Sequence, residues 1–361
     1  MRTGHGHPGE LSLIEQIRAR AAQSTNRRKI FANGMHLGIG DDCALLRTGP
    51  HKELALTTDL SIDGRHFRLA WHPPESIGHR VLARGLSDLA AMGARPVAAF
   101  LSLGLPGELV SDFPGIFSEA RKKNGKKTWM QRFLDGFFAL AREFQTPLAG
   151  GDLAESSIAL ADIVLTGAVT RGKALLRSGA RPGDLLYVTG TLGGAAVAFA
   201  RLAQWAASES RKSHAKPDFV PPQIPAKLQP ILASHLFPLP RIAQGAWLAR
   251  NGAATAAIDL SDGLSTDLFH LCKESQVAAE IDVAALPIHS GATLEQTLHG
   301  GEDYELLFAA PPDARLPRRI AGIPLTRIGR IVRMRKGQPE IRLIAAQASQ
   351  PLSPQGWEHF S

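Results

Sequence analysis

The sequence is poor in aromatic residues and lacks any apolar run long enough to cross a bilayer. Phe, Trp and Tyr make up 6% of the residues, and they do not alternate with basic residues. Proteins that bind single-stranded nucleic acid use such interleaved aromatic and basic side chains to stack bases. A transmembrane helix needs about 20 consecutive apolar residues, and the opening residues lack the apolar core of a secretory signal. We therefore expect no membrane and no nucleic-acid partner.

Cysteine is almost absent, which excludes a cysteine-based metal site. Cys43 and Cys272 are the only two cysteines and form no CxxC pair, so they cannot hold zinc by themselves. The 13 histidines are scattered, and none stands in the HExxH spacing of zinc proteases. Two unpaired thiols fit a reducing compartment, and we expect a cytoplasmic protein.

The chain carries 41 Lys and Arg against 33 Asp and Glu. A basic excess favours phosphate or nucleic-acid ligands. Five of the basic residues lie within residues 121–127, however, and this stretch is more simply explained as a solvated loop. A nucleic-acid-binding protein stays an alternative that depends on this stretch alone, and a gel shift with a steep salt dependence would test it.

Helical and strand patterns alternate along the chain, which predicts mixed α/β layers. Apolar spacing predicts helices over residues 74–93, 129–144, 193–207, 240–251 and 263–274. Alternating or continuous apolar runs predict strands over 53–59, 96–106, 159–171, 255–259 and 277–282. We interpret residues 151–157 as a turn, and residues 300–311 as a last turn followed by a strand.

The length predicts two domains, which we place at residues 1–155 and 156–361. Two polar segments are typical of surface insertions. One is the basic segment 110–128, and the other is the proline-rich segment 207–226.

The sequence also lacks the two commonest nucleotide-binding loops. The P-loop pattern fails around Gly125, because no glycine stands five residues earlier and no Ser or Thr follows the lysines. The dinucleotide pattern GxGxxG fails after Gly38 and Gly40, because Cys43 occupies the third glycine position.

Carboxylates recur at the ends of predicted strands and in glycine-flanked turns. Each of them alone is explained by a turn or a helix N-cap. Gathered in one place they would raise one another's pKa values unless a cation neutralised them. Oxygen ligands without cysteine or histidine favour Mg²⁺, and a site with several metal ions suits a polyphosphate substrate. The set predicts a phosphoryl-transfer enzyme of unusual fold and consists of Asp41, Asp42, Asp59, Asp88, Asp152, Asp259, Asp262 and Glu302.

Seven motifs resemble, in order, those of the thiamine-monophosphate kinase family, which belongs to the ATP-binding superfamily of aminoimidazole ribonucleotide synthetase. The resemblance extends over about residues 38–361. The motifs are GIGDDCALL, TTDLSIDGRHF, LARGLSDLAAMGARP, GGD, RSGARPGDLLYVTG, AIDLSDGLSTDL and GGEDYELLF. The resemblance implies an α+β fold of two domains, with the N-terminal domains of two subunits pairing into a homodimer. It also implies ATP-dependent phosphorylation of thiamine monophosphate to thiamine diphosphate with several Mg²⁺ ions.

The resemblance implies roles for the residues that match the family's motifs. The implied metal ligands are Asp42, Thr57, Thr58, Asp59, Asp88, Asp152, Asp259 and Asp262. The implied ATP contacts are Gly151, Asp152, Arg177 and Ser261, and the implied thiamine phosphate contacts are His66, Glu302 and Trp357. Leu153 and Ala154 stand where the family commonly has threonines.

We expect the reaction to need no catalytic base. A phosphate monoester has its second pKa near ~6, so the acceptor oxygen is already a nucleophilic anion at neutral pH. The obstacle is repulsion between phosphates, about 4 kcal/mol for two unit charges 4 Å apart at an effective dielectric of 20. Metal ions and Arg177 would offset this repulsion, and we expect direct in-line transfer without a phospho-enzyme.

Other activities on the same fold stay as alternatives. A selenophosphate-synthetase-like activity would need a reactive cysteine in a glycine-rich N-terminal loop, and residues 5–9 contain no cysteine. A non-catalytic regulator of the same fold is the other alternative, and the intact set of aspartates argues against it.

Overall fold

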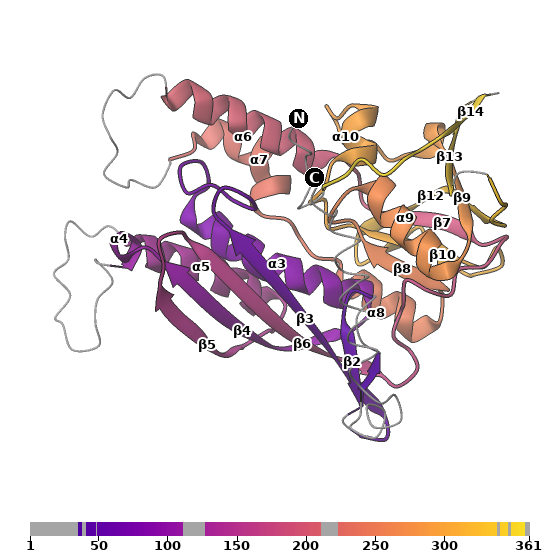
Figure 1. Cartoon of the computed structure of the whole chain (residues 1–361), viewed down its shortest axis with the longest axis horizontal. Coiled ribbons are helices and arrows are strands. Elements are labelled where there is room, and N and C mark those ends of the chain that lie inside the picture. Colours follow the sequence, from indigo (N-terminus) through magenta and orange to yellow (C-terminus); the bar gives the residue numbers. More distant parts are fainter. Residues whose placement is uncertain are drawn as a thin grey trace, which may run out of the picture.

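The computed structural model describes residues 35–37, 41–47, 49–110, 127–210, 223–337, 340–345 and 348–357. These residues form a six-stranded sheet from the N-terminal part of the chain and an eight-stranded sheet from the C-terminal part. Helix α3 (Pro74–Ala91) lies between the two sheets (Figure 1). Its last turn contributes Ala90 and Ala91 to a core shared with Leu248, Ala257 and Phe308. The two halves of the molecule therefore meet along α3.

The N-terminal sheet has the strand order β1-β2-β3-β6-β4-β5, and β4 and β5 form its one parallel pair within the described residues. Helices α3 and α5 (Trp129–Glu143) pack together on one face of this sheet. Every second residue of β6 is buried against the helices, as the strand period requires. The strands are β1 (Met35–Leu37), β2 (Ala44–Arg47), β3 (Lys52–Ile62), β4 (Arg95–Leu105), β5 (Leu148–Glu155) and β6 (Leu160–Thr170), and the short helix α4 (Gly107–Val110) follows β4.

The C-terminal sheet has the strand order β14-β13-β9-β12-β7-β10-β8, with β11 paired to β12. Its strands are β7 (Leu185–Thr189), β8 (Ala256–Asp259), β9 (Ala278–Asp282), β10 (Leu306–Ala310), β11 (Arg319–Ile320), β12 (Ile323–Val332), β13 (Ile341–Ala345) and β14 (Ala348–Pro351). The helices of this half are α6 (Gly194–Ser210), α7 (Gln229–Leu236), α8 (Ile242–Asn251), α9 (Leu264–Ser275) and α10 (Leu294–His299), with 3₁₀ turns η1 (Ala226–Leu228) and η2 (Val283–Ala285).

Residues 151–157 were expected to form a turn, and this prediction is wrong for most of the segment. Gly151 and Asp152 lie inside β5, where they pair with Leu101 and Ser102 of β4. Gly151 has a φ of 151°, and a Cβ at this position would lie 1.8 Å from the carbonyl oxygen of Leu101. The glycine therefore allows the close approach of two strands, which a sequence alone does not distinguish from a glycine in a turn.

The prediction that the strand within 300–311 is the last one is also wrong. It corresponds to β10, and β11, β12, β13 and β14 follow. In β12 the buried Ile328 and Ile331 lie three residues apart, and the strand has a register shift between Arg327 and Gly329, so the strict apolar alternation that would predict a strand is absent.

The change from one sheet to the other falls between Thr170 and Leu185. The boundary expected at 155/156 lies instead between β5 and β6, two strands of the same sheet. The reason is topological, because the chain leaves the edge strand β5 and returns to the centre of the sheet as β6. Most of segment 110–128 and much of segment 207–226 lie outside the described residues. Of their described ends, Val110 closes α4 and Thr128 caps α5.

Helix α3 presents polar side chains to the junction of the halves at a spacing of four residues. Arg80, Arg84 and Asp88 follow one another at this spacing, which places them on the same side of a helix. None of the helices in the described part of the chain is both long and apolar enough to span a membrane.

Candidate active site

A cavity of about 420 Å³ lies at the junction of the two halves. The N-terminal half contributes the end of β3, the loop after it and α3. The C-terminal half contributes the first turns of α6, the end of α7, the β8–α9 turn, the turn before β10 and the C-terminal segment. The lining residues are Asp59, Arg65, His66, Arg84, Asp88, Ala195, Ala196, Phe199, His235, Asp259, Ser261, Asp262, Gly300, Gly301, Glu302, Tyr304 and Trp357.

Three carboxylates from distant parts of the chain gather beside this cavity, and two of them, Asp88 and Asp259, line it. One oxygen each of Asp42, Asp88 and Asp259 lies within 4.8 Å of the others. Hydroxyl groups support the cluster, because Thr57 donates a hydrogen bond to Asp88 and Ser87 donates one to Asp259 at 2.6 Å. Sequence analysis had predicted the three aspartates and Thr57, but not Ser87.

The charges of these carboxylates are poorly tolerated without a cation. Burial and the charge of Asp42 raise the pKa of Asp41 to about 7 and that of Asp259 to about 8. Burial, with Asp59 and Asp259, raises the pKa of Asp88 well above its usual value. A buried group of oxygen ligands that resists ionisation is the donor set of a hard divalent cation.

Arg177 lies behind the carboxylates and does not line the cavity. Its guanidinium donates to Asp42 at 2.7 Å, and its backbone N–H donates to Asp41 at 3.1 Å. Ser275 of α9 in turn donates to the Arg177 carbonyl at 2.8 Å. Arg177 therefore ties the segment between the two sheets to the aspartates of the N-terminal half.

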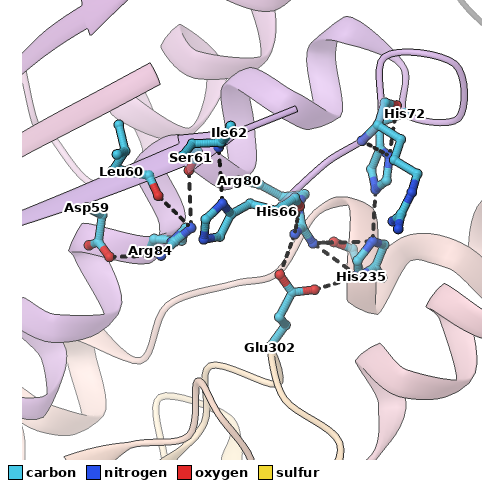
Figure 2. A network of polar contacts seen from close by, with 11 residues as sticks. Asp59, Leu60, Ser61, Ile62, His66, His72, Arg80, Arg84, His235 and Glu302 are labelled. Carbon is cyan, nitrogen blue, oxygen red and sulfur yellow. Dashed lines mark hydrogen bonds and ion pairs between the residues drawn. The ribbon is translucent and has the colours of Figure 1, made fainter. Parts of the chain in front are cut away.

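Asp59 lies at the end of β3, facing α3. One oxygen, Oδ1, accepts a hydrogen bond from Arg84 at 3.2 Å (Figure 2). The other, Oδ2, is buried and has no hydrogen-bond partner among the described residues. A buried carboxylate oxygen is costly to leave unpaired, so Asp59 also suits a cation in the cavity.

Glu302 lies on the opposite wall and is held by two cationic or polar groups. Arg80 donates to its Oε1 at 2.5 Å, and His235 Nδ1 lies 3.0 Å from its Oε2 (Figure 2). Arg80 also donates to the carbonyl oxygens of His66 and His235. Burial disfavours the Glu302 carboxylate, but Arg80 and His235 outweigh burial and lower the pKa of Glu302 well below its usual value. Glu302 is therefore a fixed anion in the cavity wall.

The C-terminal segment returns to the cavity beside the β8–α9 turn. The backbone N–H of Trp357 donates to the carbonyl of Asp262 at 3.1 Å, and that of Glu302 donates to the carbonyl of Ser261 at 2.7 Å. A Cβ at Gly356 would lie 2.0 Å from the Asp262 carbonyl oxygen, so only glycine allows this approach. The Trp357 side chain lines the cavity and is 47% exposed.

Some residues predicted for the site lie away from the cavity. Thr58 is exposed and points away from Thr57 and Asp59, because successive residues of β3 face opposite sides of the sheet. Gly151 and Asp152 are exposed on β5, the edge strand of the N-terminal sheet. The structure does not bring these three residues to the cavity of their own chain.

Sequence analysis missed several polar residues that hold the site. Arg80 and Arg84 could have been found from their spacing of four residues from each other and from Asp88. Asp267 accepts hydrogen bonds from the backbone N–H groups of Asp262 and Gly263 at 3.1 and 3.0 Å, and the motif AIDLSDGLSTDL contains it. His235 follows a polar segment and has no sequence signal.

Both halves of the chain match known domain families. Residues 40–170 match the AIR synthase-related protein N-terminal domain, and residues 181–341 match the corresponding C-terminal domain. Fold and site thus define a two-domain protein of the AIR synthase-related class.

Individual proteins and solved structures that are similar to this chain identify the family within this class. Thiamine-monophosphate kinases from Salmonella typhimurium and Escherichia coli are 36% and 35% identical, over 90% and 98% of both chains. Among solved structures, AaThiL complexed with AMPPCP and TMP matches with a TM-score of 0.74 and 26% identity over 99% of both chains. Thiamine-monophosphate kinase from Stenotrophomonas maltophilia matches with a TM-score of 0.65 and 34% identity, over 92% of this chain and 95% of that one. The chain belongs to the thiamine-monophosphate kinase family.

Proposed function

We propose that this chain transfers the γ-phosphoryl group of ATP to thiamine monophosphate, giving thiamine diphosphate and ADP. Its curated relatives carry this activity in their names, and a similar structure holds AMPPCP and TMP. The observation that carries the proposal is the cavity itself, which joins a carboxylate cluster to a wall with a fixed anion and an exposed indole. The first side suits metal-bound phosphates, and the second suits a cationic aromatic ring.

Magnesium is the cation that we assign to the carboxylates. Asp42, Asp88 and Asp259 would hold it, and Asp59 and Asp262 line the same cavity as further ligands. When bound, Mg²⁺ supplies positive charge that screens the repulsion between acceptor and donor phosphates. Thr57 acts through Asp88, which its hydroxyl orients.

The remaining predicted contacts divide between the two substrates. Ser261 would contact ATP from the β8–α9 turn, and Arg177 would act from behind the carboxylates. Glu302 and Trp357 would contact the thiamine part, because thiazolium is a permanent cation that an anion and an indole face both attract. His66 lines the same wall, with its ring Nδ1 accepting from the backbone N–H of Ile62 at 3.1 Å.

The chain's residues position the reactants and do not act as bases. The acceptor phosphate is already anionic near neutral pH, so no proton has to be removed from it. Direct in-line transfer follows when both phosphates lie between the carboxylate cluster and Glu302.

Turnover with alternative acceptors tests the proposal. The purified protein with ATP and Mg²⁺ should convert thiamine monophosphate to the diphosphate and should leave free thiamine unchanged. A hydroxyl acceptor would need a general base, and we assign the carboxylates of the cavity to metal ions and to the thiamine ring instead. Chelation of the metal serves as the control. Comparable turnover of free thiamine would contradict the proposed acceptor.

We also propose that the protein is a homodimer. The face of the N-terminal sheet opposite α3 and α5 carries apolar side chains, of which Leu60 and Phe100 are 46% and 39% exposed. An exposed apolar face of this kind is typical of an interface. Phe100→Glu should shift the protein to monomers in size-exclusion chromatography with light scattering, and an unchanged dimer would place the interface elsewhere.

Gly151 and Asp152 could then contribute to ATP binding in the site of a second copy, since they are exposed on β5 and do not line the cavity of their own chain. Subunit complementation distinguishes the two arrangements. Asp152→Asn and Asp262→Asn, each inactive alone, should regain part of the activity when mixed and reassembled, because one site of a mixed dimer then carries neither change. No recovery would mean that both residues serve the same subunit.

A nucleic-acid-binding or non-catalytic protein is not favoured. The curated relatives are thiamine-monophosphate kinases and the carboxylate cluster is intact, whereas the first alternative depends on residues 121–127 alone. The expected cytoplasmic location stays a prediction.

A further inference from the structure

Arg84 lines the cavity from the middle of α3. Its guanidinium makes three contacts, to Asp59 Oδ1 at 3.2 Å, Ser61 Oγ at 3.2 Å and the Leu60 carbonyl at 3.4 Å (Figure 2). All three acceptors belong to β3. An arginine has five N–H donors, so these long contacts leave it capacity to bind a ligand.

The neighbouring Arg80 shows what a purely structural arginine looks like in this protein. Its side chain is 4% exposed and donates at 2.5–2.9 Å to Glu302, to the His66 carbonyl and to the His235 carbonyl. The Arg84 side chain is 17% exposed, lines the cavity and makes longer contacts. The comparison separates an arginine that joins protein segments from one that faces a ligand.

The charge of Arg84 is permanent. Burial disfavours it, but Asp59, Tyr304, Glu302 and Asp88 outweigh burial and raise the pKa of the guanidinium. Within the cavity lining, Arg84 and the exposed Arg65 are the two arginines, against five carboxylates. A polyanionic substrate would therefore meet a buried cation at Arg84.

Arg84 also stands between the two sides of the cavity. On α3 it lies one turn from Asp88, which belongs to the carboxylate cluster, and one turn from Arg80, which holds Glu302. If the thiamine ring lies at Glu302 and its phosphate points toward the carboxylate cluster, that phosphate comes close to the Arg84 guanidinium. The planar fork of an arginine suits such a phosphate because it can donate two parallel hydrogen bonds.

We propose that Arg84 binds the phosphate of the acceptor and thereby favours thiamine monophosphate over free thiamine. This inference rests on the proposed function. It gives the cavity a selective element for the acceptor phosphate that is separate from the magnesium ligands.

Calorimetry in the presence of Mg²⁺ and a non-hydrolysable ATP analogue measures this role without turnover. Arg84→Gln should weaken thiamine monophosphate binding about 10- to 100-fold, the effect of losing a charge-assisted pair, and Arg84→Lys should lie between it and the wild type. Binding of free thiamine should change by less than about 2-fold, because thiamine has no phosphate for Arg84 to contact. Arg330→Gln is the matched control, since Arg330 is an exposed arginine paired with Glu280.

Two results would overturn the inference. Unchanged binding of thiamine monophosphate to Arg84→Gln would show that the guanidinium does not contact the phosphate. Equal weakening of thiamine and its monophosphate would show that Arg84 only maintains the shape of the cavity.

Inorganic tripolyphosphate separates this inference from the proposed function. If the wild type fails to phosphorylate thiamine monophosphate, the proposed function is wrong. Weaker tripolyphosphate binding by Arg84→Gln would still support a phosphate-binding Arg84, and unchanged tripolyphosphate binding would then overturn it.

Discussion

Individual carboxylates in the cavity differ in what surrounds them, and their surroundings define what each can do. Glu302 is paired with Arg80 and His235 and stays ionised. Asp88 and Asp259 instead share a buried cluster and favour their protonated forms. An ionised carboxylate held in place can attract a cationic ring, whereas a buried cluster of carboxylates attracts a metal ion.

Asp88→Asn tests the metal site at this scale. The change keeps the size of the side chain and removes one charge, so kcat should fall at least ~10²-fold and the Mg²⁺ concentration required for activity should rise. Steady-state kinetics over a Mg²⁺ titration, with a thermal melt to confirm folding, measures both. Asp135→Asn is the control, because Asp135 is exposed and pairs with Lys127 outside the cavity. A folded Asp88→Asn protein with wild-type turnover would remove Asp88 from the ligand set.

Trp357→Ala tests whether the indole contacts the thiamine part of the substrate. Loss of the indole should raise KM for thiamine monophosphate about 3- to 30-fold, and Trp357→Phe should recover part of it, because a smaller aromatic face still attracts a cation. KM for ATP should stay near the wild-type value. Equal weakening for both substrates, or a lower melting temperature with unchanged KM, would make Trp357 a structural residue that covers the cavity.

At the scale of elements, helix α3 contacts both halves of the molecule and supplies three polar side chains of the site. It packs on the N-terminal sheet, on α5 and on the C-terminal half, and it bears Arg80, Arg84 and Asp88. The two helices α3 and α5 lie close together, because a glycine of each helix packs against the backbone of the other. A Cβ at Gly78 would lie 2.0 Å from the Phe133 carbonyl oxygen, and one at Gly136 would lie 1.8 Å from that of Glu75.

Gly136→Ala should therefore destabilise the protein although alanine favours helices. Separating the helices should cost roughly 1–3 kcal/mol, more than the up to ~1 kcal/mol gained in helix propensity. Urea denaturation measures the difference. Gly49→Ala is the matched control, because no atom lies within 4 Å of a Cβ at Gly49. Equal stability of Gly136→Ala and the wild type would mean that α3 and α5 separate without cost.

At the scale of the whole molecule, the site exists only where the two halves meet. Asp59 and Asp88 come from the N-terminal half, and Asp259, Asp262 and Glu302 come from the C-terminal half. A metal ion held by both sets would bind the folded assembly and not the unfolded chain, so it should stabilise the whole molecule.

The pH dependence of stability tests this coupling. An aspartate in the unfolded chain has a pKa near 3.9. In the folded protein the pKa of Asp41 is raised to about 7 and that of Asp259 to about 8. Between these values the folded state binds more protons than the unfolded state, so without metal the free energy of unfolding should fall as pH rises through about 4 to 8.

Added Mg²⁺ should reverse this trend, because it competes with protons for the carboxylate oxygens of Asp88 and Asp259 and binds better as pH rises. Thermal melts at several pH values, with Mg²⁺ or with a chelator, measure the effect. Stabilisation by Mg²⁺ that is independent of pH, or greatest at low pH, would show that these carboxylates are not its ligands.

The sequence by itself predicted what local patterns encode. Apolar periodicity located α3, α5, α8 and α9 to within a few residues, because one face of each helix is buried. The glycine-flanked aspartates and the seven motifs led to the family, and the cavity does contain Asp59, Asp88, Asp259, Asp262, Glu302 and Trp357.

Only the tertiary structure decided which of these residues work together. Gly151 and Asp152 stand in a family motif, yet the parallel pairing of β4 and β5 places them on an exposed edge strand, and they do not line the cavity. Arg84 and His235 enter the site because α3 and α7 meet the turn before β10, residues far apart in the chain. Short-range spacing reports the face on which a side chain lies, whereas its partners depend on long-range packing that periodicity does not encode.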